Sequence, residues 1–171
     1  EIKVDKRDDL FAATPPLEAM KLLLSLAVTE GVGYQKDHKK SGMKLDFIDI
    51  RRAYYHAPAR REVYVKLPPG DEEEGMCGLL IKSLPGTRDA AQNWEELYMT
   101  SMHRLGFNSG KVTPCMFWHP QKGIRVNIHG DDFTVLGHEE QLDWFRREIR
   151  KDFDAKFRGR IGPDIYDDKS I

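Results

Sequence analysis

The feature that most constrains the fold is a pair of short apolar segments, residues 124–128 and 133–136, with two adjacent aspartates between them. Both segments are rich in β-branched or aromatic residues and the connection is short, so they are predicted to pair as a β-hairpin. Gly130 helps the backbone to make the turn. Asp131 and Asp132 would repel each other there unless solvent or a cation offsets their charge. They are either ordinary turn residues or part of a cation-binding site.

Apolar periodicity predicts three helices and further strands around this hairpin. Apolar residues recur at helical spacing over residues 17–28, 89–105 and 139–153. Short apolar or alternating segments predict strands at residues 43–50, 62–67, 79–84 and 115–119. This order predicts an α+β fold in which an antiparallel sheet has helices packed on one face. A ferredoxin-like split βαβ arrangement fits the same order.

Composition excludes several classes of protein. A chain of 171 residues, 40% of them hydrophobic, is expected to form one globular domain. With 27 basic and 28 acidic residues, it has no global charge that would attract nucleic acid. No apolar run approaches the ~20 residues of a membrane-spanning helix. Cys77 and Cys115 have neither the number nor the spacing of a zinc site or a disulfide framework, and we expect both to be reduced thiols.

A third carboxylate, Asp49, ends the apolar strand predicted at residues 43–50. If the hairpin pairs beside that strand, Asp49, Asp131 and Asp132 converge at one edge of the sheet. Such hard oxygen ligands suit Mg²⁺ or Mn²⁺. Two ions about 3.5–4 Å apart can activate an attacking hydroxyl and stabilise a departing pyrophosphate, which makes nucleotidyl transfer the leading reaction class.

Several sequence blocks occur in order between roughly residues 10 and 165. They are residues 14–17 before an apolar helix, 49–55 (DIRRAYY), 62–70 (EVYVKLPPG), 82–94 (KSLPGTRDAAQNW), 105–107 (LGF) and 129–132 (HGDD). Together they resemble the reverse transcriptase of copia-type LTR retrotransposons. The corresponding segments of that family read DVKTAFL, EVYM-x-QPPG, KSLYGLKQAPRQW and Tyr-Val-Asp-Asp.

The resemblance implies a polymerase palm with part of the fingers over residues 1–171, which adds dNTPs to a primer 3′-hydroxyl on an RNA or DNA template. It implies that Asp49, Asp131 and Asp132 bind two Mg²⁺ or Mn²⁺ ions, with the backbone carbonyl of Ile50 as a further ligand. Tyr54 would lie under the incoming sugar and select deoxynucleotides.

Further nucleotide contacts are expected on both sides of this centre. The resemblance implies that residues 86–92, including Gly86, Arg88 and Gln92, line the nucleotide and template side. Arg51 and Arg52 beside Asp49 either neutralise the triphosphate or form surface ion pairs.

The partners that the resemblance implies are template–primer, dNTPs and the rest of a Pol polyprotein: fingers, thumb, RNase H and integrase. The basic finger segment is expected before Glu1, and the thumb and RNase H beyond Ile171. The implied location is intracellular, in a cytoplasmic retrotransposon particle or in the nucleus, with no membrane. The chain departs from the family pattern at Pro85 and Ala91, and at His129 in place of tyrosine.

A basic stretch near the C-terminus is a candidate surface for nucleic acid. Residues 145–160 hold seven basic side chains against three acidic ones. They either form a solvated face or contact template–primer phosphates, in which case binding falls steeply with salt. His129 is a turn residue, a template contact or a general acid for pyrophosphate. The basic residues are Arg146, Arg147, Arg150, Lys151, Lys156, Arg158 and Arg160.

Three alternatives to an active reverse transcriptase stay open. The chain could be an inactive remnant of a retroelement that binds nucleic acid or only folds. It could be a metal-dependent nucleotidyl cyclase on a similar palm. The Gly-Asp-Asp sequence also occurs in viral RNA-dependent RNA polymerases, but those usually carry a second aspartate where this chain has Tyr54, which favours DNA synthesis.

Overall fold

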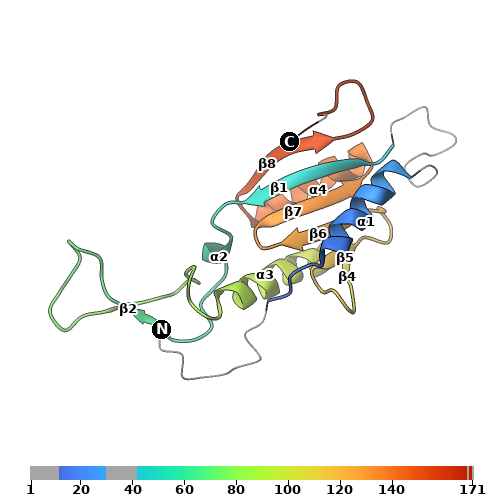
Figure 1. Cartoon of the computed structure of the whole chain (residues 1–171). Helices are drawn as coiled ribbons and strands as arrows, with labels where there is room; N and C mark the ends of the chain where they lie inside the picture. The colour runs from blue at the N-terminus through green and yellow to red at the C-terminus, as the bar shows by residue number, and fades with distance from the viewer. Residues whose placement is uncertain (1–11, 30–41, 169, 171) are drawn as a thin grey trace.

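Strand β1 (Lys44–Ile50) is an interior strand that pairs antiparallel with β7 (Asp132–Gly137) on one side and β8 (Ala155–Ile161) on the other. The computed structural model describes residues 12–29, 42–168 and 170. The main sheet has six antiparallel strands in the order β4-β5-β6-β7-β1-β8 (Figure 1). A mixed fold on an antiparallel sheet is therefore confirmed. The remaining strands of this sheet are β4 (Asn108–Ser109), β5 (Met116–Trp118) and β6 (Arg125–His129).

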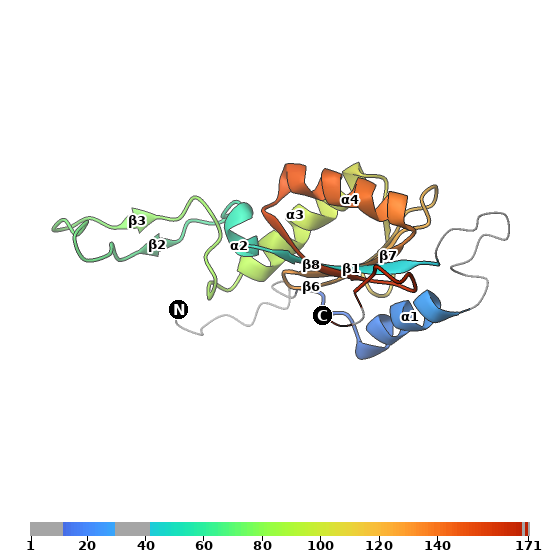
Figure 2. The ribbon, with the colours of Figure 1, turned by 90° about the horizontal axis from the view of Figure 1, so that it is seen from above.

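Helices cover both faces of this sheet. α3 (Ala90–Arg104) and α4 (Glu139–Asp152) pack on one side, the α3/α4 face, whereas α1 (Leu17–Val28) lies against the other, the α1 face (Figure 2). We expected helices on one face, which holds for α3 and α4 but not for α1. The reason lies in β1, because alternate residues of a strand point to opposite faces. Leu45 packs under α1, and Ile48 packs under α3 and α4.

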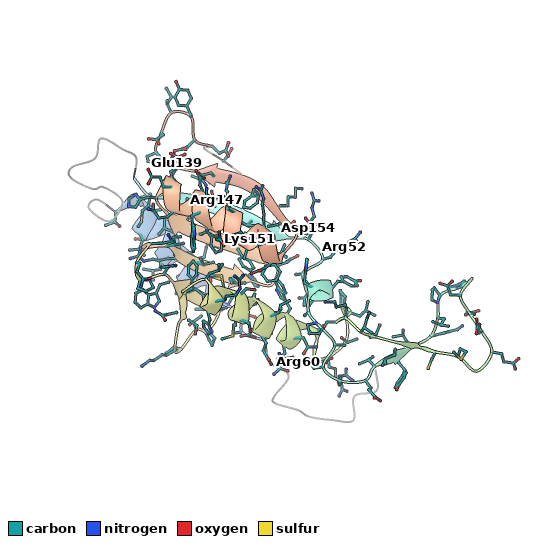
Figure 3. The ribbon with its side chains drawn as sticks, turned by 180° about the vertical axis from the view of Figure 1, so that it is seen from behind. Arg52, Arg60, Glu139, Arg147, Lys151 and Asp154 are labelled. Atoms are coloured by element: carbon teal, nitrogen blue, oxygen red, sulfur yellow. The ribbon has the colours of Figure 1, made fainter. Side chains whose placement is uncertain are left out.

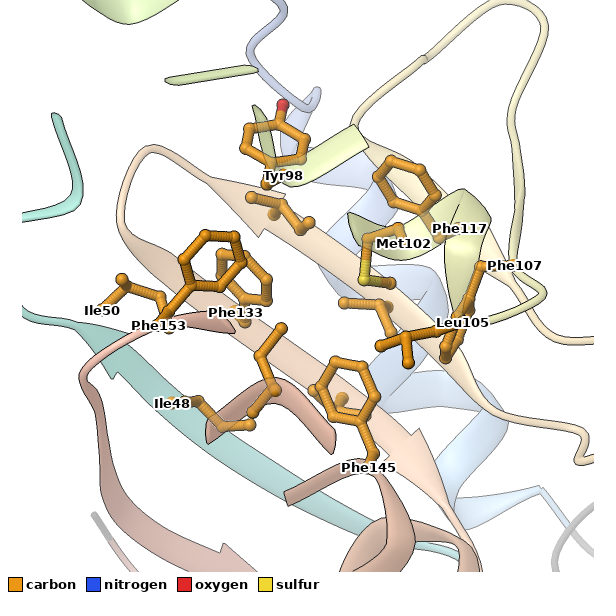
Figure 4. Packing of buried hydrophobic residues seen from close by; sticks show 14 of the residues in the cluster. Ile48, Ile50, Tyr98, Met102, Leu105, Phe107, Phe117, Phe133, Phe145 and Phe153 are labelled. Atoms are coloured by element: carbon orange, nitrogen blue, oxygen red, sulfur yellow. The ribbon is translucent and has the colours of Figure 1, made fainter. Parts of the chain in front are cut away.

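The main core lies between the sheet and α3 and α4 (Figure 4). Ile48 and Phe133 enter it from the sheet, and Trp94, Phe145 and Phe153 from the helical side. Burying a large apolar side chain contributes about 1.5–3 kcal/mol, so this cluster holds β1, β7 and both helices together. A smaller cluster joins Leu23 of α1 to Leu45 and Leu136.

A narrow arm extends from the main sheet (Figures 1 and 2). It carries β2 (Tyr64–Val65) and β3 (Gly78–Leu79), which form a separate two-stranded sheet. These strands are shorter than the segments predicted at residues 62–67 and 79–84. An isolated pair of strands has no core to pack on, and Tyr64, Leu79 and Ile81 are exposed.

Three elements had not been predicted: α2 (Ala53–His56), β4 and β8. In β8, apolar or small residues alternate with basic ones, but a basic run is equally typical of a solvated surface. The pairing of β8 with β1 is interrupted by a β-bulge between Phe47 and Ile48. Within the described ranges, none of the helices combines the length and apolar character needed to cross a lipid bilayer.

Candidate active site

Four residues on four neighbouring strands form one row across the end of the sheet. Direct partners on adjacent strands point to the same face. The neighbours Ile48 and Phe133 enter the core of the α3/α4 face, so the row lies on the α1 face. From β6 to β8 it reads His129, Asp132, Asp49 and Lys156. The structure thus places Asp49 and Asp132 directly opposite each other on neighbouring strands.

The hairpin between β6 and β7 turns through Gly130 and Asp131. Gly130 has a φ of +63° and Asp131 has a negative φ, which is the pattern of a type II′ turn with glycine at its first central position. The backbone N–H of Ile50 donates to the Asp131 carbonyl at 2.9 Å. Asp131 is therefore tied to the end of β1, one residue beyond Asp49.

Trp94 of α3 holds the same turn from the helical side. Its indole Nε1–H donates to the Gly130 carbonyl at 2.8 Å, and the residue is only 2% exposed. The ring also packs edge-on against Phe153, with centroids 4.9 Å apart. Trp94 lies on the apolar stripe of residues 89–105, a position typical of a core residue. The signal for the second role is that a buried indole N–H needs an acceptor.

Arg158 reaches over the row from β8. Its Nη2 lies 2.8 Å from Asp49 Oδ1 and 3.6 Å from Asp132 Oδ1. The hydrogen bond to Asp49, together with the charges of Asp49, Asp132 and Asp131, raises the pKa of Arg158 above its ordinary value. One guanidinium therefore offsets part of the charge of two facing carboxylates.

The oxygen atoms at this site are of the kind that binds hard divalent cations. The Asp49 side chain is 19% exposed and that of Asp132 is 60% exposed, so solvent ions reach both. Across residues 12–29, 42–168 and 170, no three His, Cys, Asp or Glu side chains are grouped so that they could hold a metal ion. The donor chemistry fits a divalent cation, and Arg158 shows that positive charge is stabilised between the two carboxylates.

The segment after Asp49 turns sharply into α2. Arg52 adopts a left-handed backbone conformation (φ +53°, ψ +41°) at the start of α2, which is uncommon outside glycine. Arg51 and Arg52 are both exposed there. The Arg51 backbone N–H donates to the Asp154 carbonyl at 2.9 Å. Tyr54 is half-buried and packs against the main core.

The segment before α3 lies beside the end of α2, because the backbone N–H of Ser83 donates to the carbonyl of Ala57 at 2.9 Å. Gly86 (φ +93°) and Arg88 belong to the turns before this helix, and Gln92 lies in its first turn. The side-chain amide of Asn93 donates to Ser83 Oγ at 3.0 Å, which braces these turns against the helix.

Arg146 belongs to an ion cluster on the α3/α4 face. Asp46 of β1, whose side chain is 1% exposed, accepts two hydrogen bonds from Arg146 at 2.7 and 2.8 Å. It accepts two more from Arg160 at 2.6 and 3.0 Å. The bulge in β8 explains why Arg160 and Arg158, only two residues apart, serve opposite faces of the sheet.

The other basic residues of the C-terminal stretch divide between the two faces. Arg147 and Lys151 lie on α4 (Figure 3), and Arg150 stacks over the Phe157 ring at 4.2 Å. These three therefore lie on the face away from the carboxylates. Lys156 and Arg158 lie beside the carboxylates on the α1 face.

Comparisons with known proteins identify the family. The family model described as reverse transcriptase (RNA-dependent DNA polymerase) matches residues 2–163. The chain is 23% identical over 159 residues to the retrovirus-related Pol polyprotein from transposon TNT 1-94 of Nicotiana tabacum. That match covers 89% of this chain and 11% of the relative's length. No solved structure matches the chain. Because the family model spans nearly all of it, the chain belongs to the reverse transcriptase (RNA-dependent DNA polymerase) family, and its relative and sequence blocks identify the copia-type retrotransposon branch.

Proposed function

We propose that this chain forms the palm active site of an RNA-directed DNA polymerase that adds dNTPs to a primer 3′-hydroxyl on an RNA or DNA template. The observation that carries the proposal is the in-register pairing of Asp49 with Asp132, with Asp131 in the adjoining turn. An antiparallel sheet with two helices on one face and carboxylates on the other is what a ferredoxin-like palm requires. The rest of a Pol polyprotein would supply the other polymerase regions.

Asp49 and Asp132, which face each other, would hold Mg²⁺ or Mn²⁺. The Asp131 side chain and the Ile50 carbonyl would complete the ligands of two ions on binding, since the three carboxylates are not grouped around one point beforehand. Such ions activate the attacking hydroxyl and stabilise the departing pyrophosphate. The chain's contribution is to fix its oxygen ligands in advance, which reduces reorganisation during the reaction. Asp49 is held between β7 and β8, and the turn at Asp131 is held by backbone and indole hydrogen bonds.

The residues that follow Asp49 would bind the incoming nucleotide. Tyr54 is braced by the main core, so its ring would form a rigid floor under the sugar and exclude a 2′-hydroxyl. Arg51 and Arg52 are exposed at the start of α2, where their charge would neutralise the triphosphate. Gly86, Arg88 and Gln92 would line the template side.

We assign primer–template contact to His129, Lys156 and Arg158, because they share the α1 face with the carboxylates. Contacts with phosphates make binding weaken steeply as salt increases. The basic residues of α4 would not join this contact, since α4 covers the opposite face and Arg146 is committed to Asp46.

The first test is a thermal-shift titration with Mn²⁺ and Mg²⁺. The unaltered chain should gain several degrees in Tm, since binding to the folded state alone stabilises it. Asp49→Asn and Asp132→Asn should lose most of this gain. The matched control is Asp143→Asn, which removes a carboxylate paired with Arg160 on the α3/α4 face and should retain the full gain. No metal-dependent gain, or an equal gain in all four proteins, would overturn the proposal and favour an inactive remnant.

The second test measures extension of a labelled primer by one nucleotide on RNA and DNA templates. Incorporation of dNTPs that disappears in Asp131→Asn and persists in Asp143→Asn supports the assignment. Incorporation that survives Asp131→Asn contradicts the proposed role of that carboxylate.

A further inference from the structure

Arg158 occupies the place between the two carboxylates that the proposed reaction needs. Its Nη2 lies 2.8 Å from Asp49 Oδ1, within hydrogen-bonding distance, and 3.6 Å from Asp132 Oδ1. A divalent ion ligated by Asp49 needs lone pairs on the same carboxylate. Arg158 and a divalent ion bound through Oδ1 of Asp49 therefore compete for the same oxygen atom.

The β-bulge in β8 makes this arrangement possible. In a regular strand Arg158 and Arg160 would point to the same face, because alternate residues do. The register of β8 against β1 shifts between Phe47 and Ile48. Arg160 consequently joins Asp46 on the α3/α4 face, while Arg158 joins Asp49 on the α1 face.

The electrostatics of the row favour a cation there. Like charges directly opposite each other on neighbouring strands are destabilising, and Asp49 faces Asp132. Lys156 and His129 stand at the two ends of the row, each beside one carboxylate. Arg158 is the cation that contacts both.

We propose that Arg158 is an internal counter-cation, which holds Asp49 and Asp132 together in the metal-free protein and has to leave Asp49 before a divalent ion binds there. Arg158 is then a positioning residue, and its competition sets the concentration of divalent ion at which the two carboxylates bind that ion. Its side chain is 50% exposed, so it can swing into solvent without disturbing the core. The inference rests on the proposed function, because it assumes that these carboxylates take a divalent ion.

The experiment compares Mn²⁺ dissociation constants, obtained from the electron paramagnetic resonance signal of free Mn²⁺, for the unaltered chain, Arg158→Gln and Arg158→Lys. Removing the competing charge should tighten Mn²⁺ binding by Arg158→Gln about 5- to 30-fold. Arg158→Lys keeps the charge but not the planar group that reaches both carboxylates, so its affinity should fall between the other two.

The matched control is Arg104→Gln. Arg104 is also an ion-paired arginine, with a side chain 53% exposed, but its partner is Asp152 on the α3/α4 face. It should bind Mn²⁺ like the unaltered chain. An unchanged or weaker affinity in Arg158→Gln, or an equal gain in Arg104→Gln, would overturn the inference and leave the proposed function intact. Absence of Mn²⁺ binding in every protein would overturn both.

Discussion

The indole Nε1–H of Trp94 donates a 2.8 Å hydrogen bond to the carbonyl of Gly130. This bond joins the first half of α3 to the turn that carries Asp131. The carbonyl of the first central residue points away from a type II′ turn, so it needs a partner outside the hairpin. Packing of α3 on the sheet and placement of the turn are therefore coupled through one bond.

Trp94→Phe tests this coupling, because phenylalanine keeps an aromatic ring and lacks the N–H. The Gly130 carbonyl is partly buried. Leaving a fully buried carbonyl unpaired costs about 1–3 kcal/mol, so urea unfolding should show a loss near the lower end of this range. Mn²⁺ should also raise the Tm of the variant less than that of the unaltered chain. Trp118→Phe is the control, since Trp118 is 51% exposed. An unchanged Mn²⁺ response in Trp94→Phe would show that the bond only stabilises the core.

Asp46 is predicted to be a large electrostatic determinant of stability. It is buried and accepts two hydrogen bonds from each of two arginines. Asp46→Asn removes the negative charge and leaves Arg146 and Arg160 facing each other. Breaking a buried ion pair in this way costs about 3–5 kcal/mol, which chemical denaturation should detect. Asp143→Asn removes a half-exposed partner of Arg160 and should cost about 1 kcal/mol or less. Equal losses in the two variants would contradict the prediction.

The folded protein should lose stability in mild acid because of His119. Burial, and then the charge of Lys122, lower the pKa of His119 below its ordinary value of 6.5. Its Nδ1 also accepts a hydrogen bond from the Lys122 backbone N–H, at 3.3 Å, which a protonated Nδ1 could not do. The unfolded chain therefore binds a proton at this residue more readily than the folded chain does. The free energy of unfolding falls as the pH drops below about 6.5, by up to ~1.4 kcal/mol per pH unit.

The measurement is urea denaturation between pH 7.5 and pH 5 for the unaltered chain and His119→Gln. The variant should lose part of the slope, because glutamine does not titrate. His103→Gln is the control, since His103 lies on the exposed side of α3 and its replacement leaves the surroundings of His119 unchanged. A slope that stays the same in His119→Gln would contradict the assignment.

Much of the fold was predictable because the positions of its helices and strands depend on residue patterns within each segment. The apolar spacing predicted α1, α3 and α4 to within one or two residues, and the apolar runs on either side of Gly130 predicted β6 and β7. Their alternation also reflects which residues enter the core, as Phe133 and Val135 do. A tight turn at Gly130 was also predicted, and the structure shows a positive φ there; the turn has two residues, shorter than the connection at 129–132 left between the predicted strands.

The rest depended on contacts between distant residues. Nothing local to Arg146 indicates that its partner is Asp46, 100 residues earlier in the chain. A helix with basic residues on its outer side looks the same whether those residues meet solvent, nucleic acid or a buried carboxylate. For the same reason the basic stretch was treated as one surface. In the structure α4 places its basic residues on the α3/α4 face, and the bulge in β8 separates Arg158 from Arg160. The sequence predicted that Asp49 and Asp132 converge only if the hairpin pairs beside β1. Strand pairing between residues more than 80 positions apart leaves no local pattern from which that pairing could be predicted.

Gly130 offers the sharpest test of how strongly the site depends on the turn. A Cβ at Gly130 meets no atom within 4 Å, so Gly130→Ala introduces no clash and acts only through the positive φ of +63°. Gly123 has nearly the same φ, +65°, and equally open surroundings, but lies in the loop before β6. Both alanine variants should lose about 1–2 kcal/mol of stability. Gly130→Ala alone should weaken Mn²⁺ binding, because relaxing its φ moves the peptide that precedes Asp131. A similar weakening in Gly123→Ala would mean that affinity follows overall stability, and equal Mn²⁺ affinity in all three proteins would mean that the carboxylates are positioned by β1 and β7 without help from the turn.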